Sequence, residues 1–447
     1  MGSSRIDGKW VNHRRFLDRG VTILRPMLRR YADALRFLNQ FTDYERMAST
    51  YSPGEYNLER MRRLTTALGR PDRAFLSLHI AGTKGKGSTA HLAEAILREA
   101  GYRTGLYTSP HLVDMRERIR LGGVPVGERD FTAVMAEMEP ELRRLRPTYF
   151  ETMTAAAFLL FARKRVQFAV IEVGLGGRLD ATNVILPAAC AITTIDYDHM
   201  DKLGKTLTKI AGEKAGILKP GVPAVSSPQP PEARRVLLER ARTLVFPRFR
   251  ILPSAGFVLK FRVDGPGGRP YAVSLPGLGE HQAANAATAI ALVERAGVTT
   301  TPAIVRRALR RVRLPARVEV VGRDPWVIVD AAHNPVSARA LAAALERVKR
   351  RRTVLVFGAS ADKDYGSMLR ALLPAADLAI FTRAENPRAA ATSDLMRAAR
   401  GRPAIAAGSV ARALAMARKA AGPQDAIVVA GSFYVAGEAL GAMGRHG

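Results

Sequence analysis

Residues 75–101 constrain the fold more than any other stretch, because three patterns follow one another there without a break. An apolar run predicts a strand, a glycine-rich loop reads GTKGKGST over residues 82–89, and a one-sided apolar pattern predicts a helix that ends before Gly101. Glycines let backbone N–H groups approach phosphate oxygens, and a helix N-terminus adds partial positive charge. The stretch therefore predicts a nucleotide-phosphate site on a strand–loop–helix unit.

The spacing of this loop differs from that of the common P-loop, because it runs G-x-x-G-K-G-S instead of placing four residues between the glycines. Lys86 can reach the outer phosphates, and the hydroxyl of Ser88 or Thr89 can face a magnesium ion. A glycine-rich loop by itself is usually only a turn. The strand before it and the helix after it favour binding of ATP or GTP.

The formal net charge is +29, from 69 Lys and Arg against 40 Asp and Glu. Such a charge can attract a phosphate backbone, so a basic P-loop ATPase that binds nucleic acid is one alternative. The arginines are scattered, however, and aromatic residues make up only 6% of the chain, whereas a platform for single strands needs aromatics among its basic residues. We therefore expect a largely solvated arginine surface, part of which attracts an anionic substrate, and no nucleic-acid partner.

The length of 447 residues allows two or three domains. No window holds the roughly 20 uninterrupted apolar residues that a membrane helix needs, and the basic N-terminus lacks the apolar centre of a signal peptide. We therefore expect a cytoplasmic protein without a membrane partner. The single cysteine, Cys190, can form neither an internal disulfide nor a thiolate metal cluster, and its apolar surroundings predict core filling in a strand.

Polar residues interrupt or follow two further apolar runs. Glu172 stands within the near-continuous run 167–173, which is typical of a strand buried on both faces. A buried, unpaired carboxylate costs several kcal/mol, so Glu172 should pair with a cation or a metal, or lie at the mouth of its strand. The run 189–195 leads into an acidic segment that contains His199, and this setting favours a metal-binding or catalytic role for the histidine.

Two other segments have weaker signals. Residues 174–180 read GLGGRLD, but the match to a dinucleotide-binding fingerprint fails because Leu179 occupies the third glycine position. Lys214 lies on a helix expected over residues 206–215, where a lysine is ordinarily a surface residue.

The pattern of elements predicts an α/β protein with a basic extension at residues 1–30 and two domains. A P-loop-containing, mostly parallel-sheet ATPase domain is expected over residues 31–312, with a helical pattern at 131–165 and an antiparallel hairpin at 256–275. A smaller, doubly wound, Rossmann-like α/β domain is expected over residues 313–447, because apolar strands alternate there with helices. Its expected strands are 327–330, 353–357, 378–382, 404–407 and 426–430.

Taken together, nine stretches resemble the folylpolyglutamate synthase and dihydrofolate synthase family of the Mur ligase superfamily, and the resemblance runs from about residue 31 to about residue 437. They read HIAGTKGKGST, TSPHL, EVGLGGRLDATN, DHMDKLGKTLTKIAGEKAGILKPG, GEHQAANA, LPARVEVV, VDAAHNP, FGASADKD and GSFYVAGEA. The resemblance implies an ATP-dependent acid–amino-acid ligase of folate biosynthesis. Such an enzyme joins L-glutamate to dihydropteroate or a reduced folate through an acyl-phosphate, and we expect it to be monomeric.

The resemblance also implies roles for individual residues. The nucleotide-binding set is Thr83, Lys84, Gly85, Lys86, Gly87, Ser88, Asn285, Arg317, Asp330 and His333. The magnesium ligands are Ser109, Glu172 and His199. The pterin-side substrate contacts are Thr148, Leu179, Asp180 and Ala181. The catalytic set is Lys86, Lys214 and His199, and Lys214 matches a lysine that is carbamylated in the family and assists a second magnesium ion.

Two departures from the family pattern qualify these expectations. The family usually has Asn where this chain has Lys84, which adds a positive charge beside the phosphates. Gly54-Glu55-Tyr56-Asn57 stands where many dihydrofolate synthases carry an Asp-containing segment, so the dihydropteroate activity is less firmly implied than the polyglutamate activity. A superfamily ligase that acts on another carboxylate is the closest alternative.

Overall fold

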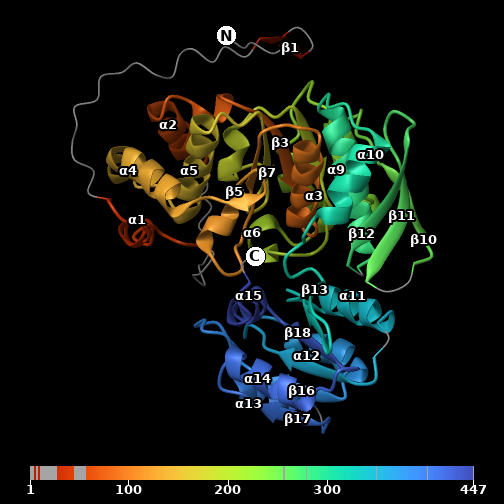
Figure 1. Cartoon of the computed structure of the whole chain (residues 1–447). Coiled ribbons are helices and arrows are strands. Elements are labelled where there is room, and N and C mark those ends of the chain that lie inside the picture. The colour runs from red at the N-terminus through yellow and green to blue at the C-terminus, as the bar shows by residue number, and fades with distance from the viewer. Residues whose placement is uncertain are drawn as a thin grey trace.

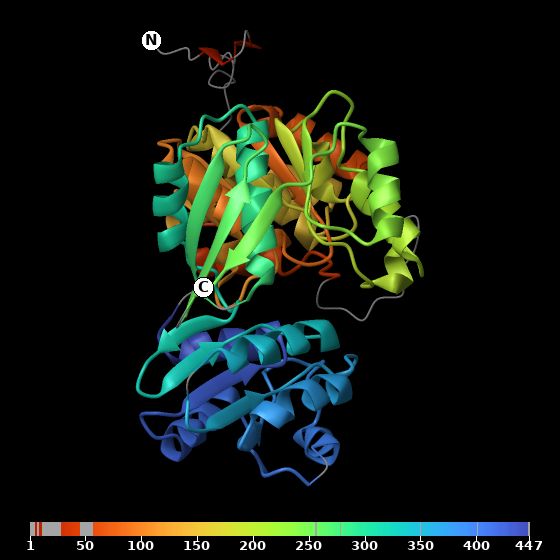
Figure 2. The same cartoon turned by 90° about the vertical axis from the view of Figure 1, so that its right-hand side faces the viewer.

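The computed structural model describes residues 5–6, 9–10, 28–44, 57–254, 257–277, 279–348, 350–399 and 401–445. Most of the expected basic extension at 1–30, and residues 54–56 of the departing segment, lie outside these ranges. The described chain forms two bodies, which lie above and below each other in Figures 1 and 2. The first body ends with α10 (Pro302–Arg311), and the second body begins with β13 (Glu319–Gly322). Within the described ranges no helix is both long and apolar enough to cross a bilayer.

The first body is built on a seven-stranded sheet. Its strands are β3 (Leu76–Ala81), β4 (Thr104–Tyr107), β5 (Ile119–Leu121), β6 (Val124–Pro125), β7 (Phe168–Glu172), β8 (Ala189–Ile192) and β9 (Ala224–Ser226). They lie in the order β6-β5-β4-β7-β3-β8-β9, and the five strands from β4 to β9 in that order are parallel. The strand before the glycine-rich loop is thus central, with β7 and β8 on either side.

Alternate residues of the central strands enter separate cores on the two faces of this sheet. Val170 packs with α3 (Lys86–Glu99), α9 (His281–Arg295) and α10 (Pro302–Arg311), whereas Ile171 packs with the helices of the other face. Those helices are α1 (Tyr31–Leu38), α2 (Glu59–Ala67), α4 (Glu128–Leu145) and α5 (Tyr149–Arg163). Burial on both faces explains why the strands are almost wholly apolar. Cys190 is buried in β8, as predicted.

Three antiparallel strands form a second sheet against α9 and α10 (Figure 2). They are β10 (Arg248–Leu252), β11 (Val258–Asp264) and β12 (Pro270–Pro276). The alternation of buried Leu259, Phe261 and Val263 with exposed neighbours confirms the predicted hairpin. The third strand, β10, was not predicted, and neither was the antiparallel pair β5–β6.

The second body contains a six-stranded sheet in the order β13-β14-β18-β15-β16-β17, parallel except for β13. Its strands are β13 (Glu319–Gly322), β14 (Trp326–Val329), β15 (Thr353–Phe357), β16 (Leu378–Phe381), β17 (Ala404–Ala406) and β18 (Ala426–Ala430). Its helices are α11 (Pro335–Glu346), α12 (Tyr365–Leu372), α13 (Thr392–Ala398), α14 (Val410–Ala420) and α15 (Phe433–Ala442). The five predicted strands and the doubly wound arrangement are confirmed, and β13 is an addition.

The helical pattern at residues 131–165 divides into α4 and α5. Arg146 takes a left-handed conformation with φ +43° and ends α4, and the following Pro147 has no N–H to continue a helix. Thr148 then caps α5 by accepting a hydrogen bond from the N–H of Glu151 at 3.2 Å. Two punctuating residues thus separate helices that share one apolar pattern.

The two bodies meet along α15, which Figure 1 places on the side of the second body that faces the first. Leu112 and Val113 of the first body pack against the core that contains α15. A Cβ atom built on Gly437 would lie only 2.0 Å from the carbonyl oxygen of Leu112. Since α10 ends at Arg311 and β13 begins at Glu319, we propose that the domain boundary lies near residue 313.

Gly437→Ala tests this close contact. We expect the substitution to destabilise the protein by about 1–3 kcal/mol, the usual cost of overpacking, even though alanine favours a helix over glycine by roughly 1 kcal/mol. The midpoint of urea unfolding measures the change. Gly441→Ala is the matched control, because its Cβ would meet Val113 at an ordinary 3.5 Å. Equal midpoints for the two variants would contradict tight packing of α15 on Leu112.

Candidate active site

The glycine-rich loop connects the end of β3 to the start of α3 through two glycines with positive φ. Gly82 has φ +146° and Gly85 has φ +90°, a region that other residues rarely adopt. A Cβ on Gly82 would lie 1.9 Å from the hydroxyl of Thr193, and one on Gly85 would lie 2.2 Å from the Oδ1 atom of Asn285. Asn285, on α9, therefore touches the loop as its predicted nucleotide-binding role requires.

The first half of the loop is hydrogen-bonded to the neighbouring strand segment, and its second half leads into the first N–H groups of α3. The backbone N–H groups of Thr83 and Lys84 both donate to the carbonyl of Thr194, at 3.0 and 3.1 Å, so these N–H groups point away from a phosphate on the loop. The first N–H groups of α3, from residue 86 onward, have no acceptor within the helix and form an anion-binding end. The Nζ atom of Lys86 lies 3.5 Å from the carbonyl oxygen of Thr83 and spans the loop.

The Glu172 carboxylate lies at the carboxyl end of β7 and is only 4% exposed. It accepts a hydrogen bond from the backbone N–H of Ser109 at 3.2 Å, and a Cβ on Gly87 would stand 3.3 Å from its Oε2 atom. Burial raises the pKa of Glu172 to about 7, against the opposing positive charge of Lys86. The carboxylate predicted to need a cation is thus enclosed between the start of α3 and the loop that follows β4.

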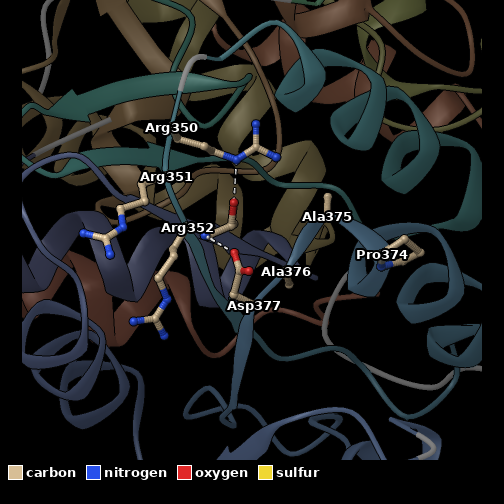
Figure 3. Close-up of a pocket in the computed structure, with 8 residues that line it drawn as sticks. Arg350, Arg351, Arg352, Pro374, Ala375, Ala376 and Asp377 are labelled. Carbon is tan, nitrogen blue, oxygen red and sulfur yellow. Dashed lines mark hydrogen bonds between the residues drawn. The ribbon is translucent and has the colours of Figure 1, made fainter.

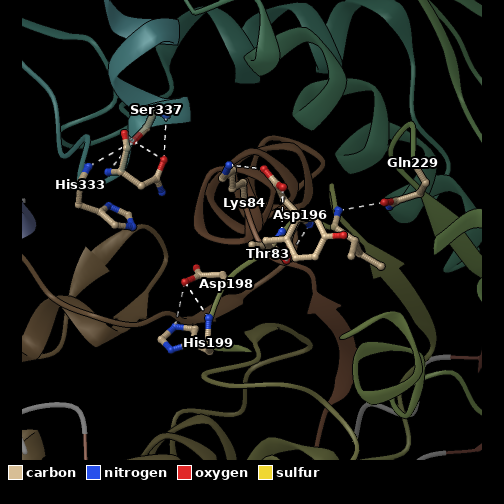
Figure 4. Close-up of polar contacts among 11 residues, drawn as sticks. Thr83, Lys84, Asp196, Asp198, His199, Gln229, His333 and Ser337 are labelled. Atoms are coloured by element: carbon tan, nitrogen blue, oxygen red, sulfur yellow. Dashed lines mark hydrogen bonds and ion pairs between the residues drawn. The ribbon is translucent and has the colours of Figure 1, made fainter. Parts of the chain in front are cut away.

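His199 precedes the short helix α6 (Met200–Leu203) with φ +47°, and its side chain is half exposed. Its backbone N–H donates to Asp198 at 3.0 Å, and its ring lies 3.9 Å from the same carboxylate (Figure 4). Burial raises the pKa of Asp198, but His199, His333 and the lysines nearby outweigh this and lower it. Asp198 therefore stands where charges of both bodies meet.

Lys214 is buried, although a lysine on a helix is ordinarily a surface residue. It lies on α7 (Leu207–Ala215), is 4% exposed, and donates from Nζ to the carbonyl of Gly82 at 2.9 Å. Burial, followed by the charge of Lys86, lowers the pKa of Lys214 to about 7. A lysine that would ordinarily be solvated thus lies beneath the glycine-rich loop with much of its amine in the neutral form near neutral pH.

Three predicted nucleotide-binding residues come from the second body. Arg317 lies between two residues with positive φ, Ala316 and Val318, and its guanidinium stacks 4.9 Å from the centre of the Phe433 ring. Its positive charge acts on Glu172 of the first body, where it opposes the rise in pKa that burial causes.

Asp330 and His333 follow β14. Both oxygens of Asp330 accept backbone hydrogen bonds, from Val318 at 2.7 Å and from Ala332 at 2.8 Å, and burial raises the pKa of this carboxyl to about 6. The Nδ1 atom of His333 lies 3.0 Å from the carbonyl oxygen of Ala331. Asp330 therefore holds the strained segment around Arg317 in place.

The predicted substrate residues shape two loops. Thr148 caps α5, and the buried Asp180 accepts hydrogen bonds from the N–H of Leu175 at 2.9 Å and of Thr182 at 3.0 Å. Leu179 and Ala181 flank Asp180, the former half-buried and the latter buried. Asp180 thus folds the GLGGRLD segment, and contact of these four residues with a substrate stays a prediction.

Sequence reasoning missed Glu117, which organises the loop that carries Ser109. Its carboxylate accepts three backbone hydrogen bonds, from Leu112, Val113 and Asp114, at 2.9, 3.1 and 2.9 Å. The signal was present in the sequence, because residues 114–117 form a capping box with an acidic residue at each end.

A shallow pocket of about 230 Å³ on the second body lies apart from this site (Figure 3). It is lined by arginines 350–352 and by residues 374–377, next to the amino ends of β15 and β16. Hydrogen bonds from Arg350 and the N–H of Thr353 occupy its polar centre, the latter ending on Asp377 (Figure 3). Parallel sheets bind ligands at the carboxyl ends of their strands, so this pocket is not assigned to the active site.

Comparison with known proteins decides the family. The Mur ligase middle domain matches residues 80–224, and the Mur ligase glutamate ligase domain matches residues 316–433. The chain is 37% identical over 361 residues to the dihydrofolate synthase/folylpolyglutamate synthase of Bacillus subtilis, covering 76% of this chain and 83% of that protein. The chain belongs to the folylpolyglutamate synthase/dihydrofolate synthase family. This confirms the resemblance found in the sequence, and members of this family are ATP-dependent ligases.

Solved structures agree with this assignment. FolC of E. coli in complex with DHPP and ADP has a TM-score of 0.81 at 30% identity, covering 93% of this chain and 98% of that one. The bifunctional folylpolyglutamate synthase/dihydrofolate synthase of Yersinia pestis, complexed with AMPPNP and Mn ion, has a TM-score of 0.81 at 32% identity with the same coverage. The family fold therefore extends over both bodies of this chain.

The residues of this family member fit a magnesium ion that ATP helps to hold. Across the described ranges, no three His, Cys, Asp or Glu side chains lie close enough to hold a metal ion by themselves. Glu172 has more acceptor positions than the one N–H of Ser109 fills, and the predicted set adds a hydroxyl and an imidazole. Mg²⁺ commonly takes one or two carboxylates and completes its shell with phosphate oxygens and water.

Removing the carboxylate tests this fit. We expect Glu172→Gln to raise the Mg²⁺ concentration for half-maximal ATP turnover by at least roughly tenfold, because a neutral amide holds the ion weakly. A magnesium titration of phosphate release measures the shift. Glu94→Gln is the control, because Glu94, which lies on α3, is buried like Glu172 but pairs with Arg98 and Thr104. Equal shifts in the two variants, or none in Glu172→Gln, would reject Glu172 as a metal ligand.

Proposed function

We propose that this chain uses ATP to join L-glutamate to the carboxylate of dihydropteroate or of a reduced folate. The observation that supports this most strongly is the enclosure of the Glu172 carboxylate by the start of α3 and by Ser109. It brings a helix N-terminus, a lysine and a buried carboxylate to one edge of the sheet. Those are the groups that transfer of a phosphoryl group to an anion requires.

The reaction proceeds in two steps. An oxygen of the pterin carboxylate attacks the γ-phosphorus of ATP, the bond from that phosphorus to the bridging oxygen breaks, and ADP leaves. The amine nitrogen of glutamate then attacks the acyl carbon, gives up a proton, and inorganic phosphate leaves with the acyl C–O bond electrons. A carboxylate is a poor electrophile, so the first step supplies the leaving group that the second step needs.

The first body offsets the repulsion between ATP and the pterin carboxylate, which are both anions. In this proposal Lys86 and the N–H groups at the start of α3 hold the β- and γ-phosphates, while Thr83 fixes the loop through its contact with Thr194. Ser109, Glu172 and His199 would hold Mg²⁺, which when bound would supply charge neutralisation of the phosphates. The relatives complexed with ADP, and with AMPPNP and Mn ion, support ATP and a divalent metal as ligands of this chain.

The second body completes the site. The charge of Arg317 acts on Glu172 and that of His333 acts on Asp198, which supports their approach to a nucleotide bound on the first body. Asp330 contributes by holding the backbone next to Arg317. We place the incoming glutamate against this body, so that closure of the two bodies brings its amine to the acyl-phosphate and excludes water.

We further propose that Lys214 carries a carbamate. The reaction joins CO₂ to a neutral amine and releases a proton, and the buried Nζ of Lys214, with its pKa near 7, supplies such an amine. The carbamate would replace a positive charge by a negative one beneath the loop, and its oxygens would supply ligands for a second magnesium ion.

Substrate dependence tests the proposed ligase activity. Phosphate release should require a pterin carboxylate and L-glutamate together, and mass spectrometry should show the glutamylated product. Offering dihydropteroate and tetrahydrofolate separately identifies the synthase activities present. Stimulation by DNA or RNA but not by pterins would reject the proposal in favour of a nucleic-acid-bound ATPase. Turnover with glutamate and a different carboxylate would indicate another member of the superfamily.

The pH dependence of Lys214 tests the carbamate. Because the folded pKa is about 7, the amine is mostly neutral about one pH unit above that value, and protonation removes the reactive form as the pH falls below it. In ¹³C-bicarbonate, we expect a carbamate NMR signal on the alkaline side that is lost on the acid side and is missing in Lys214→Met. An identical signal in the variant, or none in the parent protein, would contradict the proposal.

A further inference from the structure

Lys84 adds a positive charge to the glycine-rich loop, but its side chain leaves the end of the loop where α3 begins. Its Nζ atom lies 2.5 Å from the Oδ2 atom of Asp196, in the segment that follows β8 (Figure 4). Both side chains are about one-third exposed, at 29% and 34%. The pair is therefore a partly solvated contact at the edge of the site.

Backbone and hydroxyl contacts surround this ion pair. The N–H groups of Thr83 and Lys84 donate to the carbonyl of Thr194. The Thr83 hydroxyl donates to the carbonyl of Asp196 at 3.1 Å and lies 3.1 Å from the N–H of the same residue, which donates to it. Residues 83–84 and 194–196 thus form one connected unit, although more than a hundred residues separate them in sequence.

The far side of this unit is fixed by Gln229. Its amide oxygen accepts from the N–H of Ile195 at 2.9 Å (Figure 4). Its amide nitrogen donates to the carbonyl of Thr193 at 2.9 Å. Three residues beyond Asp196 the chain reaches His199. The segment that Lys84 contacts is therefore anchored at one end and carries a predicted magnesium ligand at the other.

We propose that Lys84 is a positioning residue whose ion pair with Asp196 holds the nucleotide loop in register with the segment that carries His199. The ammonium stays on Asp196 when nucleotide binds and makes no contact with a phosphate. The proposal rests on the proposed function only in taking this loop as the nucleotide site. It explains why the loop carries Lys84, since the positive charge of this residue is already paired with the Asp196 carboxylate.

The two roles for Lys84 give opposite expectations for its partner. A positioning role requires Asp196→Asn to weaken binding as Lys84→Ala does, because either change breaks the same pair. If Lys84 bound a phosphate, removal of the Asp196 charge would free the ammonium, and nucleotide would bind equally well or more tightly.

Calorimetric binding of Mg²⁺·AMPPNP to the full chain tests this with a double-mutant cycle. We expect Lys84→Ala and Asp196→Asn each to raise the Kd about two- to fivefold, the range for a partly exposed ion pair, and the double variant to show no further loss. Lys84→Arg should retain most of the affinity, and Lys205→Ala, an exposed lysine away from the pair, should leave it unchanged. In Lys84→Ala and Asp196→Asn, the KM for ATP should rise while kcat stays near that of the parent protein.

Three results would overturn the proposal. They are an unchanged or lower Kd in Asp196→Asn, additive losses in the double variant, and no change in Lys84→Ala. Because the cycle measures nucleotide binding without turnover, it remains informative if no folate substrate is accepted. Failure of the ligase assay with an intact coupling between the two residues would reject the proposed substrates and leave this role of Lys84 standing.

Discussion

The carboxylate of Glu172 imposes the strongest constraint on the structure, because it is held almost out of solvent at the end of a central strand. Strands β4, β7 and β3 are neighbours in the sheet, so the loops that follow them meet at its carboxyl edge. One of these loops donates an N–H to the carboxylate, and another leads into the helix whose first turn packs against it. A buried negative charge without a partner costs several kcal/mol, so this geometry requires cations.

Positively charged side chains from both bodies lie close enough to Glu172 to stabilise its ionised form. The positive charge of Lys86 opposes the rise in the pKa of Glu172 that burial causes, and Arg317 of the second body acts in the same direction. Burial, followed by the positive charge of Lys86, lowers the pKa of Lys214, so much of its amine is neutral near neutral pH. Only a few of the positive charges act at the site, while most of the arginines in the described part of the chain are exposed. In the proposed reaction, this local excess of positive charge offsets the repulsion between ATP and the substrate carboxylate.

Much of this arrangement could be predicted from the sequence because its signals are local. The strand–loop–helix unit, the buried strands and the interruption of an apolar run by Glu172 are visible within a few residues of one another. The burial of Lys214 could not be predicted, because its hydrogen-bond acceptor, Gly82, lies 132 residues away. The ion pair of Lys84 and the added strands β10 and β13 are also non-local, since pairing across a sheet leaves little trace in a single segment. The motif resemblance supplied roles for Asn285 and Arg317 that no local pattern contained.

A crystal structure of the chain with Mn²⁺ and a non-hydrolysable ATP analogue tests the central role of Glu172 most directly. The anomalous signal of manganese locates the ion independently of the phosphates. The account predicts a peak within about 2.0–2.3 Å of a Glu172 carboxylate oxygen, bridged to a phosphate oxygen of the nucleotide and close to Ser109 and His199. An ion held by phosphate and water alone, with Glu172 outside its coordination shell, would contradict the account.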